Sequence, residues 1–402
     1  MRILASLFHP SGSWLFSGSE RRFCALTEKW QASGHEIWAL EPRPFAADSM
    51  VAGYQPVSVS VRGSNLGSQL FSWYLRAVSE GIATARRVGV DLIYATNNNV
   101  FNLLVAGALA RRLSLPCVVV VHHLRWVTYD EDAAARPTGR YAPLAFLNAL
   151  AREGMPVGGA IGRVAGAQLE SQLLPTFDGF LTVSDAVRGQ LVGWLPDEHV
   201  FTVGNGLHPP PRSESHVGER GKAGLYVGRL DEGKGTLDLI RVWEEVLRLS
   251  PDARLDIVGD GSLRKRLEER ASRPALVNRV RFRGFLPETD LRDLRHGSRL
   301  FLTLSRTEGF GIALAEALAD GLPVVAWDIP PLREIWGKCG AVSLCPAGDI
   351  EAVRKAVVDV LEAPPERWKL LSYEASRYVQ RFSWDEVAAK ELRILGELVG
   401  RR

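Results

Sequence analysis

The sequence predicts an α/β protein that is built from two doubly wound parallel sheets in tandem. Short strand-like runs alternate with longer helical patterns along all 402 residues, which is the pattern of β-α-β units. Several of these runs are apolar throughout, as expected for parallel strands that helices cover on both faces. The irregular stretch "HPPPRSESHVGERGK" at 208–222, rich in Pro, Ser and charge, divides the alternation into two halves.

The strands and helices can be followed along the chain. In the first half, helical segments such as 19–34 and 101–113 separate the strand candidates, which span 2–8, 35–41, 56–61, 91–96, 117–123, 179–184 and 199–205. In the second half the strand candidates span 223–228, 254–259, 280–285, 300–305, 323–327 and 341–345. We therefore place the first domain at 1–206 and the second at 207–382, with the irregular stretch as their linker.

The composition is that of an ordinary folded protein, with 24% charged and 46% hydrophobic residues. The net charge of +3 is too small to indicate nucleic-acid binding, so we expect no nucleic-acid partner. No apolar run reaches the roughly 18 residues of a membrane-spanning helix, which favours a cytoplasmic protein. The four cysteines lack metal-ligand spacing and are expected to be buried free thiols, although Cys339 and Cys345 are close enough in sequence to pair.

A second irregular segment, at 128–143, is expected to be a surface loop, and an apolar helical run at 144–154 follows it. Two interpretations of that run remain open. It is ordinary core, or it is a surface that touches a membrane or a lipid-linked substrate, since Arg125, Arg140 and Arg152 lie near it. The second interpretation would place the protein at the inner face of the membrane as a peripheral protein.

The stretch "GLYVGRLDEGKGT" at 224–236 has the spacing of a phosphate-binding P-loop at Gly228, Gly233 and Lys234, between a strand and a helix. A P-loop needs Ser or Thr directly after the lysine to hold Mg²⁺ beside the phosphates. Gly235 stands at that position instead. The loop therefore binds phosphate in another way or not at all.

The most informative stretch is "SRTEGFGIALAEALADGLPVVAW" at 305–327. The helix that it predicts is apolar on every side apart from Glu316, so this carboxylate needs a partner or a cleft to face. The amides of "GFGI" point out of the helix N-terminus and favour an anion, and Glu308 stands just before them. A salt bridge for Glu316 and a helix-capping role for Glu308 are the ordinary alternatives.

Glu308 and Glu316 stand eight residues apart, which is the E-x7-E pattern of retaining glycosyltransferases with the GT-B fold, notably glycosyltransferase family 4. The chain resembles that family along most of its length, in "SGSERRF", "VSDAV", "GNGL", "YVGRLDEGKG", "IVGDGSL", "FRGFLPE" and "EGFGIALAEALADGLPVVA". The order and spacing of these pieces make the match specific. The resemblance implies two Rossmann-like domains that face each other across a cleft, with a nucleotide-sugar donor bound in it.

The resemblance implies roles for residues of the second domain. In the family, the cations of the glycine-rich loop clamp the donor diphosphate, and Arg229 and Lys234 occupy those positions. Two cations neutralise a leaving diphosphate without Mg²⁺, so we expect no metal and no cofactor. Glu316 would accept hydrogen bonds from the ribose, Glu308 would contact hydroxyls of the donor sugar, and Phe285 would lie near the base. The backbone of four further residues would meet the sugar and the diphosphate: Gly309, Phe310, Gly311 and Ile312.

The resemblance also extends to the first domain. In "VVVVHHL" a predicted strand ends with His122, where the family has a histidine close to the donor sugar, and His123 replaces its commoner acidic residue. Either histidine can be the functional one, and a structural hydrogen bond is the ordinary alternative. Gly18 and Ser19 in "SGSERRF" would let the backbone approach the donor or the acceptor, although the family often has a second glycine at Ser19. The last segment, 383–402, resembles the family's C-terminal helix, which packs back on the first domain.

The expected activity is that of a hexosyltransferase that moves a sugar from a UDP-, GDP- or ADP-sugar to a hydroxyl acceptor, with retention of anomeric configuration. The candidate catalytic residues are Arg229, Lys234, Glu308 and His122. The acceptor is left open among lipid-linked glycans, polysaccharides and small molecules. Two alternatives would use the same donor site: a GT-B-fold nucleotide-sugar 2-epimerase, which needs no acceptor, and a nucleotide-sugar-binding protein without turnover.

Overall fold

The computed structural model describes residues 1–402 apart from 9–17, 43–52, 65, 125–156, 209–220 and 402. The described residues fall into two compact units. The first contains the residues up to Gly206 together with Ser383–Arg402, and the second contains Leu207–Phe382. Several sequence expectations lie outside the described residues: the loop at 128–143, the apolar run at 144–154 with Arg125, Arg140 and Arg152, and most of the linker at 208–222.

The first unit is built on a parallel sheet with the strand order β3-β2-β1-β4-β5-β6-β7. Its strands are β1 (Arg2–Ser6), β2 (Glu36–Glu41), β3 (Gln55–Ser58), β4 (Leu92–Ala95), β5 (Cys117–Val121), β6 (Gly179–Thr182) and β7 (Val200–Thr202). The order reverses between β1 and β4, which is the switch point of a doubly wound sheet.

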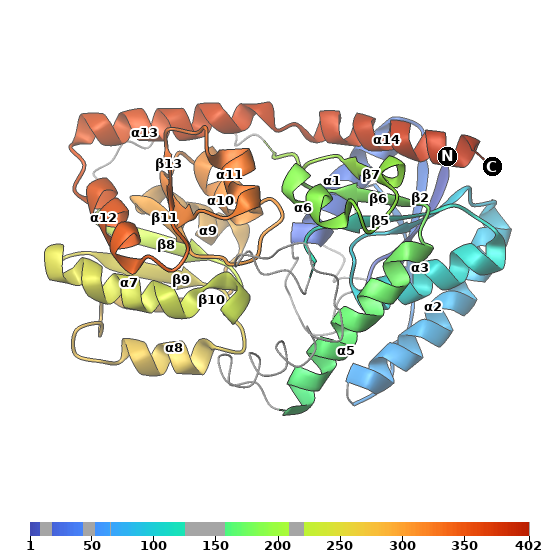
Figure 1. Ribbon diagram of the computed structural model, residues 1–402, viewed down its shortest axis with the longest axis horizontal. Helices are drawn as coiled ribbons and strands as arrows, with labels where there is room; N and C mark the ends of the chain where they lie inside the picture. Colours follow the sequence, from blue (N-terminus) through green and yellow to red (C-terminus); the bar gives the residue numbers. More distant parts are fainter. Residues whose placement is uncertain (9–17, 43–52, 65, 125–156, 209–220, 402) are drawn as a thin grey trace. The chain divides into compact units, whose positions relative to one another are not determined.

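Helices cover both faces of this first sheet (Figure 1). They are α1 (Gly18–Ala32), α2 (Leu66–Val88), α3 (Val100–Leu113), α5 (Val157–Leu173), the short α6 (Asp185–Leu191) and α14 (Trp384–Gly400). The C-terminal helix α14 packs against α1 on one face, while α3 packs against α2 and α5 on the other. The first unit is thus completed by the last residues of the chain.

The second unit has a parallel sheet with the order β10-β9-β8-β11-β12-β13. Its strands are β8 (Ala223–Val227), β9 (Arg254–Val258), β10 (Val280–Gly284), β11 (Leu300–Thr303), β12 (Val324–Trp327) and β13 (Val342–Cys345). The switch point of this sheet lies between β8 and β11.

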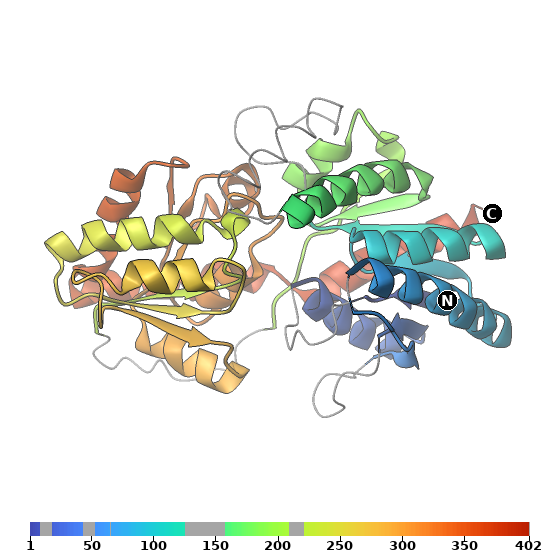
Figure 2. The same ribbon diagram turned by 90° about the horizontal axis from the view of Figure 1, so that it is seen from below.

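Helices again lie on both sides of the strands (Figure 2). They are α7 (Thr236–Leu249), α8 (Arg264–Ala271), α9 (Glu288–Gly297), α10 (Ile312–Ala319), α11 (Pro330–Trp336), α12 (Ile350–Leu361) and α13 (Pro365–Tyr378). Helix α7 packs against α8 and α12, and α10 packs against α13. A Schellman motif ends α10, because Gly321 adopts a φ of 74° and Leu322 donates to the carbonyl of Ala317 at 2.9 Å.

The prediction of two doubly wound α/β sheets is confirmed, and each predicted strand overlaps one strand of the structure. Every residue of β4, β5, β6, β11 and β12 is buried, which explains why these runs are apolar throughout. Several predicted strands extend past the observed ones. His122 and His123 follow the end of β5, and Leu304 and Ser305 follow the end of β11, so these residues lie at the carboxyl edges of the sheets.

The four cysteines, Cys24, Cys117, Cys339 and Cys345, are buried and free, as the sequence predicts. Burial raises the pKa of Cys24 to about 12 and that of Cys345 to about 11, so neither thiol is a ready nucleophile. Among the helices in the described part of the chain, none is both long and apolar enough to cross a bilayer.

Candidate functional site

The glycine-rich loop that follows β8 lies at the switch point of the second sheet, where ligands of doubly wound folds bind. Hydrogen bonds fix its backbone. The amides of Arg306 and Thr307, which follow β11, donate to the carbonyl of Gly233 at 2.9 and 3.3 Å. Asp231 accepts from the amide of Lys234 at 3.0 Å, and the hydroxyl of Tyr226 donates to the carbonyl of Arg229 at 2.8 Å.

Gly235 explains why this loop departs from a P-loop. Its φ of 62° lies in the left-handed region, and it precedes the first residue of α7. A Cβ at this position would lie 1.8 Å from the carbonyl oxygen of Leu304. Serine or threonine therefore does not fit there, because the loop packs directly against the backbone that leaves β11.

Lys234 and Glu308 form an ion pair between the two loops of the switch point. Both side chains are about four-fifths buried, with 20% and 19% of their surface exposed. Glu308 is thus a partner of the loop lysine rather than a helix cap, since Gly311 is the N-cap of α10. Arg229 is 63% exposed and lies 3.4 Å from Asp231, so its guanidinium can reach a ligand from the same loop.

Helix α10 presents one partly exposed face that contains Ile312, Ala313 and Glu316, while its other residues are buried. The side chain of Glu316 therefore lies on the partly exposed face of α10 and not in the core, as the apolar residues around it in the sequence predict. Phe310 is 4% exposed and packs edge-on against Trp336 and Phe382, with ring centroids 5.3 and 5.4 Å away.

The backbone at the start of α10 is fixed by those aromatic contacts. Trp336 donates to the carbonyl of Phe310 at 2.8 Å, and Gly309 and Gly311 are buried. Gly311 has a φ of 86°, which turns the chain into the helix. Phe285 follows β10 and is 43% exposed, so part of this side chain is open to a ligand.

A second polar cluster lies at the switch point of the first sheet. The side-chain oxygen of Asn102 accepts from the hydroxyl of Ser6 at 3.0 Å and from the amide of Phe8 at 2.7 Å. The side-chain amide of Asn102 donates to Asn97 at 2.9 Å, and Asn97 donates to the hydroxyl of Ser19 at 3.3 Å. These contacts join the carboxyl ends of β1 and β4 to the start of α1, which begins at Gly18.

His122 lies beside this cluster, and the same loop fixes its backbone. The side chain of Asn98 accepts from the amide of His122 at 3.4 Å and donates to the carbonyl of His123 at 2.8 Å. The Nε2 atom of His122 is buried and has no hydrogen-bond partner among the described residues. Burial, the positive charge of Arg22 and the neighbouring His123 lower the pKa of His122 to about 3. The imidazole is therefore neutral at pH 7.

Several residues of these clusters were not predicted from the sequence. The asparagines Asn97, Asn98 and Asn102 carry most of the side-chain hydrogen bonds at the first switch point, and Asp231 orders the loop of Lys234. A signal was present for two of the asparagines, because Asn97 and Asn98 follow a fully buried strand, together with Asn99, in "LIYATNNN". Polar side chains at the carboxyl end of a parallel strand are a general indication of a site.

Family comparisons match both units. The Glycosyl transferase 4-like domain matches residues 17–206, and Glycosyl transferases group 1 matches residues 212–377. Together the two matches span most of the chain. The chain belongs to the family 4 glycosyltransferases. This membership confirms the family that the motif order indicates.

Individual relatives are more distant. The chain is 29% identical to the glycogen synthase of Mycobacterium tuberculosis over 240 residues, which are 58% of this chain and 57% of the relative. It is 28% identical to the 2-deoxystreptamine N-acetyl-D-glucosaminyltransferase of Streptomyces fradiae over 325 residues, 78% of this chain and 73% of that one. The chain spans about half the length of several curated relatives that it matches.

Solved structures show the same fold. Sucrose-phosphate synthase from Thermosynechococcus elongatus matches with a TM-score of 0.78 and 18% identity, over 100% of both chains. HepE from Anabaena in complex with UDP-glucose matches with a TM-score of 0.71 and 18% identity, over 99% of this chain and 100% of the other. The protein therefore has the two-domain GT-B fold.

Replacing Gly235 by alanine is expected to destabilise the protein far more than replacing Gly34. Both glycines have a left-handed φ, 62° and 81°, so both variants carry backbone strain on the order of 1 kcal/mol. Only at Gly235 would the new Cβ collide with backbone, because no heavy atom lies within 4 Å of a Cβ at Gly34. We expect Gly235→Ala to cost roughly 3 kcal/mol of unfolding free energy in urea denaturation. Equal losses in the two variants would contradict the close packing of this loop.

Proposed function

We propose that the protein is a retaining glycosyltransferase that transfers a sugar from a nucleoside-diphosphate sugar to a hydroxyl acceptor. The observation that carries this proposal is the ion pair of Lys234 and Glu308 at the switch point of the second sheet. A diphosphate calls for cations, and a sugar calls for a hydrogen-bond acceptor such as a carboxylate. Lys234 supplies the cation and Glu308 supplies the carboxylate, and the two side chains are in contact. Membership of a glycosyltransferase family supports the same conclusion.

In this proposal the donor nucleotide binds the second unit. The diphosphate takes Lys234 and Arg229 as counter-charges, and the amides at the start of α10 add hydrogen-bond donors. Glu316 accepts from the ribose hydroxyls, which its partly exposed position on α10 allows. The exposed ring of Phe285 offers a surface for the base.

In the proposed reaction, negative charge develops on the departing diphosphate. The bond between the anomeric carbon and the diphosphate oxygen breaks while the acceptor hydroxyl attacks from the same face, and the departing oxygen takes the acceptor proton. Arg229 and Lys234 stabilise the charge on the leaving diphosphate, which makes a metal ion unnecessary. Glu308 binds hydroxyls of the donor sugar. His122, neutral at pH 7, offers its buried Nε2 to the same sugar.

The comparisons guide the choice of substrates to test. HepE, a structural neighbour, was solved with UDP-glucose, so UDP-glucose is the first donor to test, before GDP- and ADP-sugars. The names of two relatives mention glycogen and 2-deoxystreptamine, which supports hydroxyl acceptors that range from a glucan to a small molecule. A lipid-linked acceptor at a membrane surface remains part of the proposal.

A two-step experiment tests this function. A thermal-shift screen of UDP-, GDP- and ADP-sugars first identifies the donor, because a ligand that binds the folded state raises the Tm. That donor is then incubated with and without hydroxyl acceptors, and the products are analysed by NMR. We expect sugar transfer with the anomeric configuration retained. An altered nucleotide sugar formed without acceptor would indicate a 2-epimerase, and an inverted linkage would contradict the retaining mechanism.

The role of Lys234 is tested with Lys234→Met in excess EDTA and without it. We expect the substitution to lower kcat/KM about 100-fold or more, as for the loss of one electrostatic contact with a developing charge. Wild-type transfer is expected to survive EDTA, because the two cations neutralise the diphosphate. Lys265→Met is the matched control, since Lys265 is exposed on α8, and it should transfer at the wild-type rate. Loss of wild-type transfer in EDTA with recovery in Mg²⁺ would contradict metal-free catalysis.

A further inference from the structure

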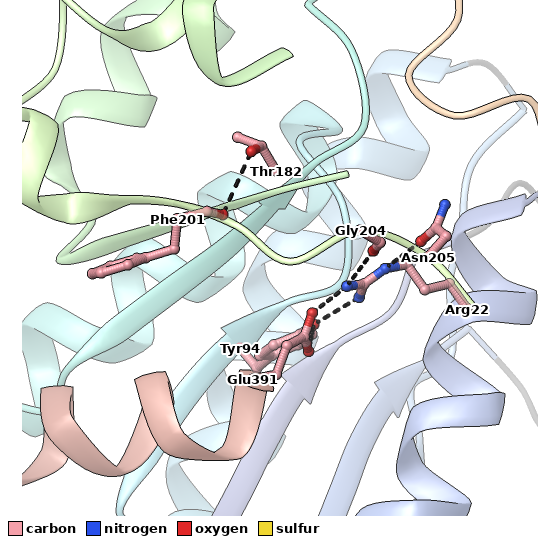
Figure 3. A network of polar contacts seen from close by, with 7 residues as sticks. All are labelled: Arg22, Tyr94, Thr182, Phe201, Gly204, Asn205 and Glu391. Carbon is pink, nitrogen blue, oxygen red and sulfur yellow. Dashed lines mark hydrogen bonds and ion pairs between the residues drawn. The ribbon is translucent and has the colours of Figure 1, made fainter. Parts of the chain in front are cut away.

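Arg22 is buried in the first unit, and its side chain is only 1% exposed. Figure 3 shows its guanidinium at the centre of a polar network. Nε donates to the side chain of Asn205 at 2.8 Å, and Nη2 donates to the carbonyl of Gly204 at 3.4 Å. Nη2 also forms an ion pair with Glu391, and Nη1 donates to the hydroxyl of Tyr94 at 3.4 Å. Such a buried cation is retained only where several partners satisfy it.

In the described residues the chain passes from the first unit to the second after Gly206 and returns after Phe382. Three partners of Arg22 belong to the segments that adjoin these two passages: Gly204, Asn205 and Glu391. Gly204 and Asn205 precede the first passage, which follows Gly206. Glu391 belongs to α14, which begins directly after the second passage at Phe382. A single side chain therefore holds both passages to α1.

The two passages are themselves packed together. The amide of Leu207 donates to the carbonyl of Phe382 at 3.0 Å. A Cβ on Gly206 would lie 2.4 Å from the backbone nitrogen of Trp384, so no side chain fits between the two segments. A contact that holds one of these two segments in place therefore also restricts the movement of the other.

The helix that carries Arg22 also belongs to the polar cluster of the first unit. It begins at Gly18, and Asn97 donates to the hydroxyl of Ser19, less than one turn before Arg22. The charge of Arg22 acts on His122 as well. The network thus joins the first switch point to both passages.

We propose that Arg22 is a positioning residue for the first unit's part of the site: its guanidinium fastens the helix that begins at Gly18 to both passages of the chain, and it sets a fixed positive charge beside His122. This inference rests on the proposed function, because it assigns His122 to the donor sugar. Arg22 itself touches no substrate. It acts by holding the backbone of the site in place and by adding its charge to the burial that lowers the pKa of His122.

Arginine suits this task better than lysine. Its planar guanidinium has five N–H donors, so it can bind Asn205, Gly204, Tyr94 and Glu391 together, whereas a lysine offers one nitrogen with three donors. A lysine would keep the charge and lose most of the connections. The two parts of the proposal can therefore be separated by substitution.

The groups that face His122 come from several elements. Arg22 acts from α1 and is itself bonded to Tyr94 of β4 and Glu391 of α14. His123 follows His122 directly in the sequence. Glu170 of α5 is bonded to Asn98, whose side chain holds the backbone of His122. Burial lowers the pKa of His122 most, and the charge of Arg22 is the next largest cause, so removing that charge is expected to raise this pKa.

The experiment uses two variants of the full-length protein. Arg22→Met combined with Glu391→Met removes both charges and keeps apolar volume, which avoids an unpaired buried carboxylate. Arg22→Lys keeps the charge. In the double variant, NMR titration should show the pKa of His122 raised by about one unit or more from about 3, whereas Arg22→Lys should leave it unchanged. Both variants should show roughly tenfold faster hydrogen exchange around 204–207 and 384–391 than the wild type.

Kinetics and a matched control complete the test. Both variants should lower kcat by about tenfold or more, with unchanged affinity for the donor nucleotide, whose proposed contacts are all in the second unit. Arg295→Met is the control, because Arg295 is also buried, with 4% of its side chain exposed, and forms its ion pairs with Glu288 and Asp320 inside the second unit. It should lose stability without changing the pKa of His122 or hydrogen exchange at the passages.

Two results would overturn the proposal. One is a double variant with the wild-type pKa of His122 and wild-type exchange at the passages. The other is a kcat that falls no further than that of Arg295→Met at equal loss of stability. The titration and the hydrogen exchange need no substrate, so failure to find any transfer would count against the proposed function and not against the role of Arg22.

Discussion

The close approach of the glycine-rich loop to the end of β11 is the constraint on which the second unit's site depends. Gly235 lets the loop backbone lie against the carbonyl of Leu304, and Gly233 accepts hydrogen bonds from the chain that follows β11. This approach brings Lys234 to Glu308. A side chain at Gly235 would separate the two loops and, with them, the charges that we assign to the donor.

The charged groups of both units are held in pairs before any ligand arrives. Lys234 is largely buried and is paired with Glu308, and Arg22 is fully buried and is paired with Glu391. Partly buried charges need such partners, because desolvation without compensation is costly. The two ion pairs differ in whether a ligand can reach them. The pair of Lys234 keeps about a fifth of its surface exposed, so a diphosphate can take over the lysine, whereas Arg22 is closed to ligands and can act only on its neighbours.

Much of the fold could be predicted from the sequence, because apolar runs bounded by glycine and polar turns are typical of buried parallel strands. The motif order indicated the family, and Lys234 and Glu308 come together as the switch point of a doubly wound sheet requires. The network of Arg22 could not be predicted. Its partner Glu391 is 369 residues away along the chain, and no local pattern distinguishes Arg22 from Arg21. The predicted strands also ran two residues past the ends of β5 and β11, to His123 and Ser305.

The most direct test of this account is the calorimetric affinity of Glu308→Gln for the nucleoside diphosphate of the donor that the screen identifies. If Glu308 holds Lys234 until a diphosphate replaces it, removing the carboxylate charge frees the lysine and removes a repulsion. The account then predicts that Glu308→Gln binds the nucleoside diphosphate several-fold more tightly than the wild type, on the order of 1 kcal/mol for one partly exposed pair. Glu316→Gln, which would lose a ribose contact, should bind it more weakly. Weaker binding by Glu308→Gln would contradict the exchange of partners at Lys234.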